Sequence, residues 1–486
     1  MKVALVYPLI KKNGQYPLLS QNRQFRYSNS LEVRIFPLVM GTAATMLKNA
    51  GHEVLFLDAI NERLSKQEYE KQLNDFKPDL ILLETKVPII KQFWKYVDEL
   101  KSSLNVKVAL CGDHVSFDPK ESLENSKVDF VLVGGDYDQG ILNLANELEN
   151  KKKFSKGIWY KEKNKVVDNG RIKDINNLDV VPFIDRELTN WQNYGEAYLY
   201  QPAMYILSGR GCGGGDYGPG KCTFCIWQHA LWQCKARLRS PKNFVAELKH
   251  LHDKYNIREV FDDNEAGGVW DKNWLFDVHE EMKKQNLLGK IRISSNARAD
   301  SLDEGTCVIM KKIGYRLLKI GVESGNDKTL KLLNKGETVK EIKEGIKCAK
   351  RHGLVVLMTT MVGFPWETKE DVNRTYEVTK ELMLYKTKVG DSLQSSVIMP
   401  YPHTPLYRQA EKEGWLIYSP KDYEKLDQTK EILKAPIDTQ KWCKKIWAIH
   451  TNPLFMFKTF FTIRTKEDVK LILTGVKSVL GHLKDY

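Results

Sequence analysis

Residues 203–225 read AMYILSGRGCGGGDYGPGKCTFC. A short apolar run at 204–207 precedes Cys212, and Cys222 and Cys225 follow in the same segment. Three thiolates this close together suit a soft metal. They fit a closed zinc site completed by Cys234 or His229, and they fit equally an iron–sulfur cluster whose fourth iron is left open.

The segment opens a regular alternation of apolar runs and helical patterns that extends to about residue 407. Strands are expected at 204–207, 259–262, 292–295, 317–322, 355–362 and 393–399. Six such units are too few for a closed eight-stranded barrel, so the pattern predicts an open, partial (β/α)6 barrel. The cysteines follow its first strand, at the end where barrel enzymes build their active sites.

An earlier alternation covers residues 1–150 and predicts a separate α/β domain with a doubly wound, Rossmann-like sheet. Its five strands are expected at 2–7, 53–57, 79–84, 106–112 and 129–133, with helices that include 37–49 and 89–102. The loops at 8–34, 85–88, 113–118 and 134–138 should then line one crevice. Gly134 and Gly135 either allow the close approach of a flat or phosphorylated group or simply ease a tight turn.

The rest of the chain divides into a connector and a C-terminal region. Residues 151–200 are expected to be a linker with a hairpin turn at Asn169-Gly170, and residues 408–486 to be helical, basic and aromatic. Phenylalanines cluster there beside Lys458 and Arg464, at positions 455, 457, 460 and 461. This stripe is either a membrane-surface face or the packed face of a capping helix.

Composition and charge limit the class of protein. A length of 486 residues allows roughly two to four domains, and 42% hydrophobic residues with a mean hydropathy of −0.43 are typical of a globular enzyme. No apolar run reaches the roughly 18 residues of a membrane span, and the first residues lack the features of a signal peptide, so a cytoplasmic location is expected. Eight cysteines are too sparse for a disulfide framework, which favours a metal site.

The net charge of +13 favours an acidic partner, such as nucleic acid, an anionic membrane surface or a phosphorylated substrate, although lysine-rich surfaces are often merely solvated. A zinc-stabilised nucleic-acid-binding protein is the alternative that this charge supports. The motifs around the cysteines favour an enzyme that does not act on nucleic acid.

Those motifs resemble the radical SAM (S-adenosylmethionine) superfamily. The stretch from Ser208 to Cys225 is similar to the family's cluster loop, although the usual C-x3-C-x2-C spacing is here C-x9-C-x2-C because residues 213–221 form a glycine-rich insert. The resemblance implies that Cys212, Cys222 and Cys225 hold a 4Fe–4S cluster beside Phe224, and that SAM occupies the open iron.

Further motifs of the family follow at the ends of the later strands. The resemblance implies that the acidic stretch 261–265, with Asp263 and Asn264, receives the methionine amino group of SAM. Ribose and carboxylate contacts are expected from Ser294, Asn296, Arg298 and Glu323. Residues 361–365 are similar to the motif beside the adenine, which includes Gly363, with Glu367 and Thr368 nearby, and residues 400–405 are similar to the turn after the sixth strand.

The first domain resembles the cobalamin-binding modules of cobalamin-dependent radical SAM enzymes. Residues 111–115 and 129–136 are similar to the ends of the fourth and fifth strands of such modules. Cobalamin contacts are expected from Thr85, Asp113, His114, Gly134 and Gly135, although His114 fits an ordinary loop residue at least as well. The D-x-H-x-x-G signature for an axial histidine is absent from this domain, so cobalamin would bind without that ligand. A degenerate module without cofactor is the alternative.

The implied activity is a methyl transfer to an unactivated carbon, through a 5'-deoxyadenosyl radical and methylcobalamin. Some members of the family instead form rings or rearrange substrates of lipid and natural-product pathways. Expected partners are a small-molecule, lipid or peptide substrate and an external electron donor such as flavodoxin or ferredoxin, with peripheral membrane contact through the C-terminal region. No catalytic side chain is identified, because the cofactors carry the difficult chemistry.

Overall fold

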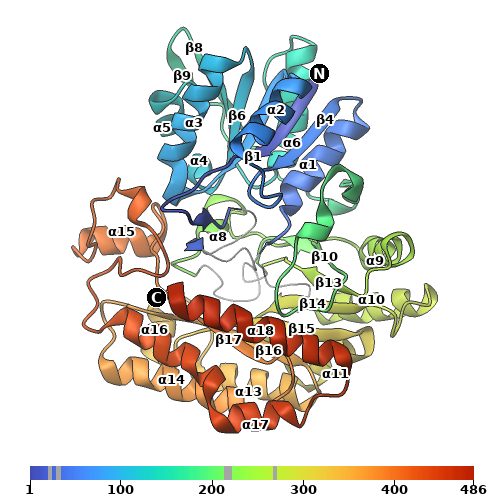
Figure 1. Ribbon diagram of the computed structural model, residues 1–486, viewed down its shortest axis with the longest axis vertical. Coiled ribbons are helices and arrows are strands. Elements are labelled where there is room, and N and C mark those ends of the chain that lie inside the picture. Colours follow the sequence, from blue (N-terminus) through green and yellow to red (C-terminus); the bar gives the residue numbers. More distant parts are fainter. Residues whose placement is uncertain (20–24, 29–33, 213–221, 266–270, 486) are drawn as a thin grey trace. The chain divides into compact units, whose positions relative to one another are not determined.

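The computed structural model describes residues 1–19, 25–28, 34–212, 222–265 and 271–485 (Figure 1). The glycine-rich insert 213–221 lies outside the described residues, as does part of the loop 8–34. The chain forms two compact units. The first combines Met1–Tyr194 with Ile226–Gln233 and Lys421–Leu426, and the second combines Gly195–Cys225 with Cys234–Pro420 and Asp427–Tyr486.

The first unit is built on a seven-stranded sheet in the order β4-β1-β5-β6-β7-β8-β9. Its first five strands in that order run parallel: β4 (Glu53–Asp58), β1 (Lys2–Tyr7), β5 (Leu80–Thr85), β6 (Lys107–Gly112) and β7 (Phe130–Leu132). β1 and β5 are apolar and almost completely buried, as expected of strands covered on both faces. The doubly wound fold and its five parallel strands are thus confirmed to within two residues at each end.

Helices cover both faces of this sheet (Figure 1). They are α1 (Leu38–Asn49), α2 (Lys66–Phe76), α3 (Ile90–Ser103), α4 (Asp113–Phe117), α5 (Pro119–Asn125) and α6 (Tyr137–Glu149). The expected loop at 113–118 is therefore mostly a short helix, which begins directly after Gly112 with φ of 113°. α8 (Ile226–Ala230), which follows the last cysteine of the cluster loop, also belongs to this unit.

A β-hairpin extends the same sheet into the predicted connector. β8 (Ile158–Glu162) pairs antiparallel with β7 and with β9 (Lys165–Val167). The hairpin turn lies at Lys163-Asn164, both with positive φ, and not at Asn169-Gly170. The Asn169 amide instead donates to backbone carbonyls of residues 154, 155 and 158, so a residue typical of a turn serves to tie two loops together.

The second unit is built on a six-stranded parallel sheet whose strands lie in chain order, which confirms the partial (β/α)6 barrel. The strands are β10 (Ala203–Ile206), β13 (Glu259–Asp262), β14 (Arg292–Ala297), β15 (Tyr315–Glu323), β16 (Val355–Val362) and β17 (Ser392–Val397). Its helices include α9 (Pro241–Tyr255), α10 (Lys272–Lys284), α11 (Glu304–Ile313), α12 (Asp327–Leu332), α13 (Val339–Arg351) and α14 (Lys369–Leu384). α13 and α14 each begin with a capping box, which fixes where the loops after β15 and β16 end.

The C-terminal region is less helical than the sequence predicts. Its helices are α15 (Pro405–Lys412), α16 (Thr439–Trp447), α17 (Pro453–Phe460) and α18 (Lys466–Asp485). A long segment separates α15 from α16 and contains an isolated bridge between Leu416 and Leu433. Gly414, Pro420 and Pro436 interrupt that segment, and both residue types end helices. Among the residues that the structure describes, no helix combines the length and apolarity needed to cross a bilayer.

Candidate functional site

The CxxC part of the cluster loop is held by the barrel unit. The Cys225 N–H donates to the Cys222 carbonyl at 3.1 Å, which closes a turn between the two thiols. Thr223 donates its N–H to the Leu333 carbonyl at 2.9 Å and accepts the Leu406 N–H at 3.0 Å. Because backbone bonds fix the segment on both sides, the two cysteines are presented in a set orientation.

Phe224, between the cysteines, fills the apolar surroundings of this turn. It packs against a buried cluster formed by Leu333, Met361, Phe364, Ile398, Leu406, Ala410 and Leu433. Three of these residues lie at or just beyond the carboxyl ends of β16 and β17. The structure therefore gives Phe224 a packing role that anchors the cluster loop to the barrel rim.

Cys212 is brought to the same place by a close backbone crossing. β11 (Gly209–Arg210) pairs with β12 (Arg237–Leu238), and a Cβ on Gly211 would lie 1.8 Å from the Lys235 carbonyl oxygen. The Gly211 N–H donates to Glu265 at 2.9 Å. Burial raises the pKa of Cys222 to about 11; Lys335 opposes this shift, and the nearby Cys212 adds to it. The Cys212 and Cys222 thiols are thus close enough to influence each other electrostatically.

The acidic loop after β13 forms a second part of the rim. Asp262 accepts the Ser208 N–H at 2.8 Å, and its burial raises its pKa to about 6. The Asn296 amide, from the end of β14, donates to Asp263 at 3.2 Å and to the Asn264 carbonyl at 2.9 Å. Three neighbouring strand ends are joined in this way, as the motif order predicts.

Glu323 is turned toward the rim by its backbone. The register of β15 against β16 shifts between Gly321 and Glu323, and Glu323 has φ of 60°, a left-handed conformation that is rare for such a residue. A Cβ on Gly321 would lie 2.2 Å from the Glu323 carboxylate, so the glycine makes room for it. Strain of this kind persists only where the surroundings enforce it.

The surroundings of Glu323 are a buried network of charges. Lys335 lies 3.5 Å from the Glu323 carboxylate and 3.3 Å from Glu337. Arg298 lies 3.6 Å from Glu337 and 2.7 Å from Asp300. Burial raises the pKa of Glu323, and Lys335 opposes this effect. Because both Lys335 and Arg298 also influence the Cys222 thiol, this network borders the cysteine site.

Three other expected contacts are separate from this network. The Ser294 hydroxyl donates to the buried Glu259, at the amino end of β13, and so faces the opposite end of the barrel from the rim. Gly363, with φ of 98°, ends β16 beside Thr439 at the start of α16. Glu367 accepts the hydroxyls of Ser324 and Thr329, each at 2.8 Å, and burial raises its pKa to about 7.

In the first unit, the carboxyl ends of the strands enclose a buried carboxylate that sequence reasoning did not single out. Glu84, on β5, accepts the hydroxyls of Tyr7 and of Tyr137, the latter at 2.8 Å, and burial raises its pKa. The adjacent Thr85 hydroxyl is used internally, since it donates to the Cys111 carbonyl at 2.8 Å. Asp113 accepts the Val87 N–H at 3.0 Å.

His114 is packed within the first unit. Its Nε2 lies 3.0 Å from Glu121, and this contact, first among several, lowers the pKa of Glu121 to about 2. The rings of Trp94 and Tyr423 meet the imidazole edge to face at 5.9 and 5.2 Å. These contacts fix the orientation of the ring.

Gly134 and Gly135 do permit the approach of a flat group, and within this unit that group is a tryptophan. A Cβ on Gly135 would lie 2.2 Å from the Trp232 ring, and the Gly135 N–H donates to the Leu231 carbonyl at 3.1 Å. Gly134, with φ of 128°, donates its N–H to the Ser116 hydroxyl at 3.1 Å. The pair therefore serves to seat the segment that follows the cluster loop.

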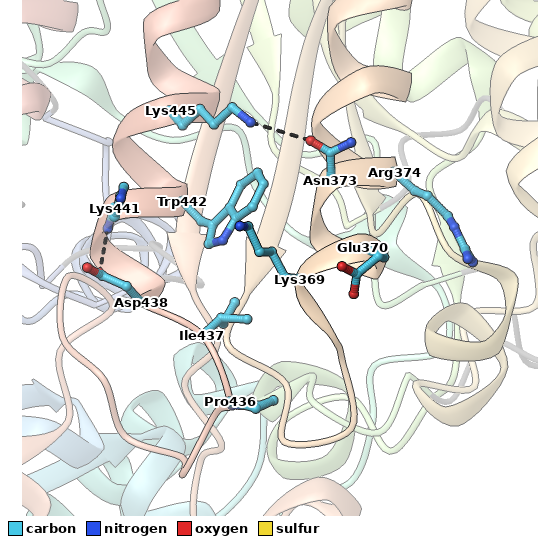
Figure 2. Close-up of a pocket in the computed structure, with 10 residues that line it drawn as sticks. All are labelled: Lys369, Glu370, Asn373, Arg374, Pro436, Ile437, Asp438, Lys441, Trp442 and Lys445. Carbon is cyan, nitrogen blue, oxygen red and sulfur yellow. Dashed lines mark hydrogen bonds between the residues drawn. The ribbon is translucent and has the colours of Figure 1, made fainter.

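A basic hollow of about 860 Å³ lies between the first turns of α14 and α16 (Figure 2). Asp438 caps α16, and Lys445 donates to Asn373 at 3.4 Å while lying over the Trp442 ring at 4.3 Å. Four cations outnumber two carboxylates among the lining residues, which are Lys369, Glu370, Asn373, Arg374, Pro436, Ile437, Asp438, Lys441, Trp442 and Lys445. The hollow adjoins Thr439, and thus the end of β16 at Gly363.

Comparison with protein families assigns both units. Residues 207–379 match the model of the radical SAM superfamily, and residues 29–138 match the model of the B12 binding domain. The chain therefore belongs to the radical SAM proteins that carry a B12-binding domain. A 4Fe–4S cluster with SAM, and cobalamin, are the cofactors of these two domains.

Individual relatives are distant. An uncharacterized methyltransferase of Pyrococcus horikoshii is 26% identical, covering 77% of this chain and 78% of the relative. The anaerobic magnesium-protoporphyrin IX monomethyl ester cyclase of Cereibacter sphaeroides is 25% identical, over 80% of this chain and 62% of the relative. The match to a methyltransferase places methyl transfer among the activities of the chain's relatives.

Two solved structures share the fold. TsrM, a radical S-adenosylmethionine methyltransferase from Kitasatospora setae, superimposes with a TM-score of 0.69 at 14% identity, covering 100% of this chain and 99% of that one. The cobalamin-dependent S-adenosylmethionine radical enzyme OxsB gives a TM-score of 0.69 at 18% identity, covering 99% and 71%. At these identities, the likeness establishes the architecture.

The residues in place fit the cofactors of the family. The thiols of Cys212, Cys222 and Cys225 are the soft donors that an iron–sulfur cluster requires. At the rim, Asn264 Oδ1 is buried without a hydrogen-bond partner among the described residues, as an acceptor for an amino group would be. In the first unit, His114 Nδ1 is likewise buried without a hydrogen-bond partner among the described residues, which suits a polar ligand such as cobalamin, whereas Asp113 Oδ2 is paired with the buried Lys86 at 3.8 Å.

Lys335, Glu337 and Glu84 are the residues that motif reasoning missed. Lys335 and Glu337 stand in a loop between α12 and α13, where charged residues are usually solvent-exposed. This loop follows helix α12 and not a strand, so the rule that places strand-end loops at one rim does not identify them. The structure shows that Lys335 pairs with both Glu323 and Glu337.

Proposed function

We propose that this protein is a cobalamin-dependent radical SAM methyltransferase that acts on an unactivated carbon. The observation that supports the proposal is that Lys335 and Arg298, from the charge network around Glu323, act electrostatically on the Cys222 thiol. The uncharacterized methyltransferase of Pyrococcus horikoshii supports methyl transfer as the reaction.

When bound, the cluster with SAM supplies a 5'-deoxyadenosyl radical, and cobalamin supplies a methyl group. The chain's own residues bind and orient. Asn264 offers its buried Oδ1 to the amino group of SAM, and Lys335 and Arg298 place positive charge where a carboxylate is to be held. Glu323, fixed by its strained backbone, is the acceptor for ribose hydroxyls.

Ring formation is the second candidate reaction. It is favoured by the match to the anaerobic cyclase of Cereibacter sphaeroides, at an identity similar to that of the methyltransferase match. The two reactions differ in what becomes of SAM. A methyltransferase of this kind yields S-adenosylhomocysteine together with 5'-deoxyadenosine, whereas a cyclase that only abstracts hydrogen yields 5'-deoxyadenosine alone.

The experiment is anaerobic reconstitution of the full chain with iron, sulfide and cobalamin, followed by reduction in the presence of SAM. We expect Cys222→Ala and Cys225→Ala each to abolish the bound sulfide and the release of 5'-deoxyadenosine. Cys443→Ala is the matched control, since Cys443 is buried on α16 against Ser395 and should leave both unchanged. SAM cleavage that survives in either cluster variant refutes the ligand assignment.

An acidic protein fits the basic hollow between α14 and α16 as the external electron donor. Four of its ten lining side chains are cationic, and Lys369, Arg374, Lys441 and Lys445 are exposed. Complementary charge of this kind raises the rate of encounter with an acidic carrier such as flavodoxin or ferredoxin. The substrate is a small molecule, a lipid or a peptide.

Peripheral contact with a membrane is the role that we propose for α17 and α18. Phe455 is buried, but Phe457, Phe460 and Phe461 are each more than half exposed, so the stripe is not simply a packed face. On α18, large apolar side chains recur on one helical face and are exposed, at Val469, Leu473, Val476 and Leu480. Exposed apolar faces flanked by lysines are typical of helices that lie on anionic lipid.

A further inference from the structure

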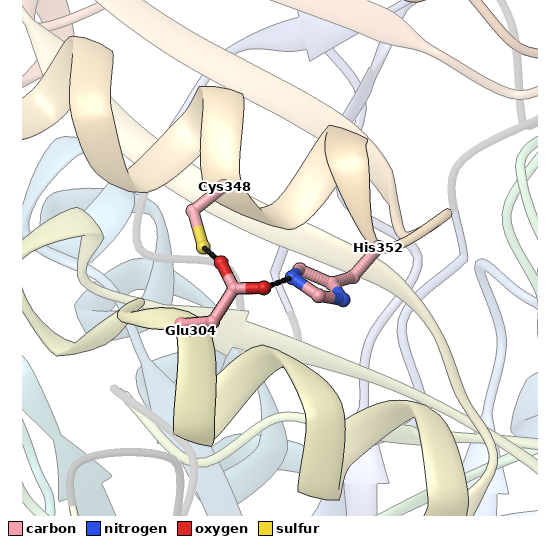
Figure 3. Close-up of side chains that lie close together, drawn as sticks. All are labelled: Glu304, Cys348 and His352. Carbon is pink, nitrogen blue, oxygen red and sulfur yellow. Dashed lines mark hydrogen bonds and ion pairs between the residues drawn. The ribbon is translucent and has the colours of Figure 1, made fainter.

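Two outer helices of the barrel unit bring together a set of metal-binding side chains away from the cluster loop. Glu304 is the first residue of α11, and Cys348 and His352 stand at the end of α13 (Figure 3). The Glu304 carboxylate lies 2.6 Å from His352 Nε2 and 3.7 Å from the Cys348 sulfur. One ligand atom from each of the three residues lies within 4.8 Å of the other two.

The spacing in the sequence explains this convergence. Cys348 and His352 are four residues apart, so they occupy one face of α13. On α11, Glu304 and Cys307 are three residues apart and share a face in the same way. Cys307 is buried and neighbours Cys348, but among the described residues only Glu304, Cys348 and His352 have ligand atoms that all lie within 4.8 Å of one another.

Exposure increases from the two cysteines to His352 and then to Glu304, as expected of a metal site that an ion can enter from solvent. Cys307 and Cys348 are 0% and 4% exposed, the His352 side chain is 22% exposed, and that of Glu304 is 69% exposed. An ion could enter past the Glu304 carboxylate and be held by the Cys348 sulfur and the His352 imidazole. Burial raises the pKa of both thiols, and a divalent cation would remove that penalty at Cys348 by stabilising the thiolate.

The distances are close to those that a tetrahedral ion requires. With metal–ligand bonds of about 2.0 to 2.3 Å, neighbouring ligand atoms are about 3.4 to 3.8 Å apart. The separation of Glu304 and Cys348 already meets this spacing, whereas the carboxylate and imidazole would have to part by about 0.8 Å. Arg351, 3.9 Å from the Glu304 carboxylate, is a competing cation, and its side chain is nearly half exposed.

We propose that Glu304, Cys348 and His352 bind a zinc-class divalent cation that ties α11 to α13. The ion replaces the hydrogen bond between His352 and Glu304, and the Cys348 thiol gives up one proton to solvent. One sulfur atom, one imidazole and one carboxylate are within the donor set of zinc. The site is independent of the radical chemistry and stands whether or not the proposed function does.

The test uses the full chain in which Cys212, Cys222 and Cys225 are replaced by alanine, so that the cluster thiols do not compete. After treatment with a chelator, the protein is dialysed against ZnCl2 and then against metal-free buffer, and the zinc that remains is measured. We expect one zinc per chain. Replacement of zinc by Co²⁺ should give the absorption of a cobalt–thiolate bond.

Four variants identify the ligands. Cys348→Ser and His352→Gln should each weaken zinc binding by at least about tenfold, since each removes a direct donor. Glu304→Gln is the variant whose folding is least at risk, because its side chain is exposed, and it should weaken binding in the same direction. The matched control is His279→Gln, which breaks a similar histidine–glutamate pair at 2.9 Å on α10 and should leave zinc binding unchanged.

The outcomes separate cleanly. Loss of zinc and of the cobalt–thiolate absorption in Cys348→Ser, with retention of both in His279→Gln, supports the site. The proposal is overturned if the protein with Glu304, Cys348 and His352 unchanged retains no zinc after dialysis. Zinc retained equally in Cys348→Ser, His352→Gln and Glu304→Gln also overturns it, because the ion would then be bound elsewhere.

Discussion

Replacing Lys335 by methionine removes the cation that lies between Glu323 and Glu337. The change keeps most of the volume of the side chain, so the packing loss is small. Lys335 is 6% exposed, and its two carboxylate partners lie at 3.5 and 3.3 Å. Removal of one partner from a buried ionic network leaves uncompensated charge and typically costs about 3 to 5 kcal/mol.

An exposed lysine on the same unit supplies the matched control. Lys343, on α13, lies 2.6 Å from Glu381, but the side chains are 32% and 41% exposed. An ion pair in contact with water contributes about 0 to 1 kcal/mol. Lys343→Met should therefore cost at least about 2 kcal/mol less than Lys335→Met, although its measured distance is shorter.

The assay is urea unfolding of the cofactor-free full chain, followed by far-ultraviolet circular dichroism at neutral pH. The double variant Lys335→Met with Glu323→Gln removes one of the two carboxylates that the single variant leaves without Lys335. We expect the double variant to recover a measurable part of the lost free energy of unfolding. Equal losses in Lys335→Met and Lys343→Met, or a double variant less stable than Lys335→Met, would refute the reasoning.

Three further perturbations test other parts of the structure. Burial raises the pKa of Glu367 to about 7, so the folded state holds this proton more tightly than the unfolded state, and stability falls as pH rises from about 4.5 to 7. Glu367→Gln should therefore raise the thermal midpoint, relative to wild type, more at pH 8 than at pH 5. An equal difference at the two pH values would contradict this reasoning. Phe457→Ser should reduce co-sedimentation with anionic lipid vesicles by about tenfold, whereas Phe276→Ser, on the similarly exposed Phe276 of α10, should not. Lys441→Glu should slow reduction of the cluster by flavodoxin but not by dithionite. The control variant is Lys340→Glu, on the exposed face of α13. If both variants are reduced by flavodoxin at the same rate, the hollow is not the docking site.

Much of the candidate site could be predicted because its motifs are local. The order of the strand-end motifs predicts that Asp263, Asn264, Arg298 and Glu323 lie at the carboxyl ends of strands, and the structure has Glu323 as the last residue of β15 and the other three directly after β13 and β14. Ser294 shows the limit of this reasoning. It lies within β14, and its hydroxyl donates to Glu259, the first residue of β13, so it points away from the end of the barrel where the cysteines lie.

The sequence by itself determined the two α/β units, the cysteine trio and the strand ends that surround it, since all of these rest on local periodicity and spacing. Tertiary structure decided which distant residues complete them. Lys335 reaches Glu323 because of a bulge and a left-handed residue, Trp232 packs on Gly135, and Glu304 meets His352 across two helices. Contacts of this kind depend on how whole elements pack against one another, and no local pattern in the chain encodes them.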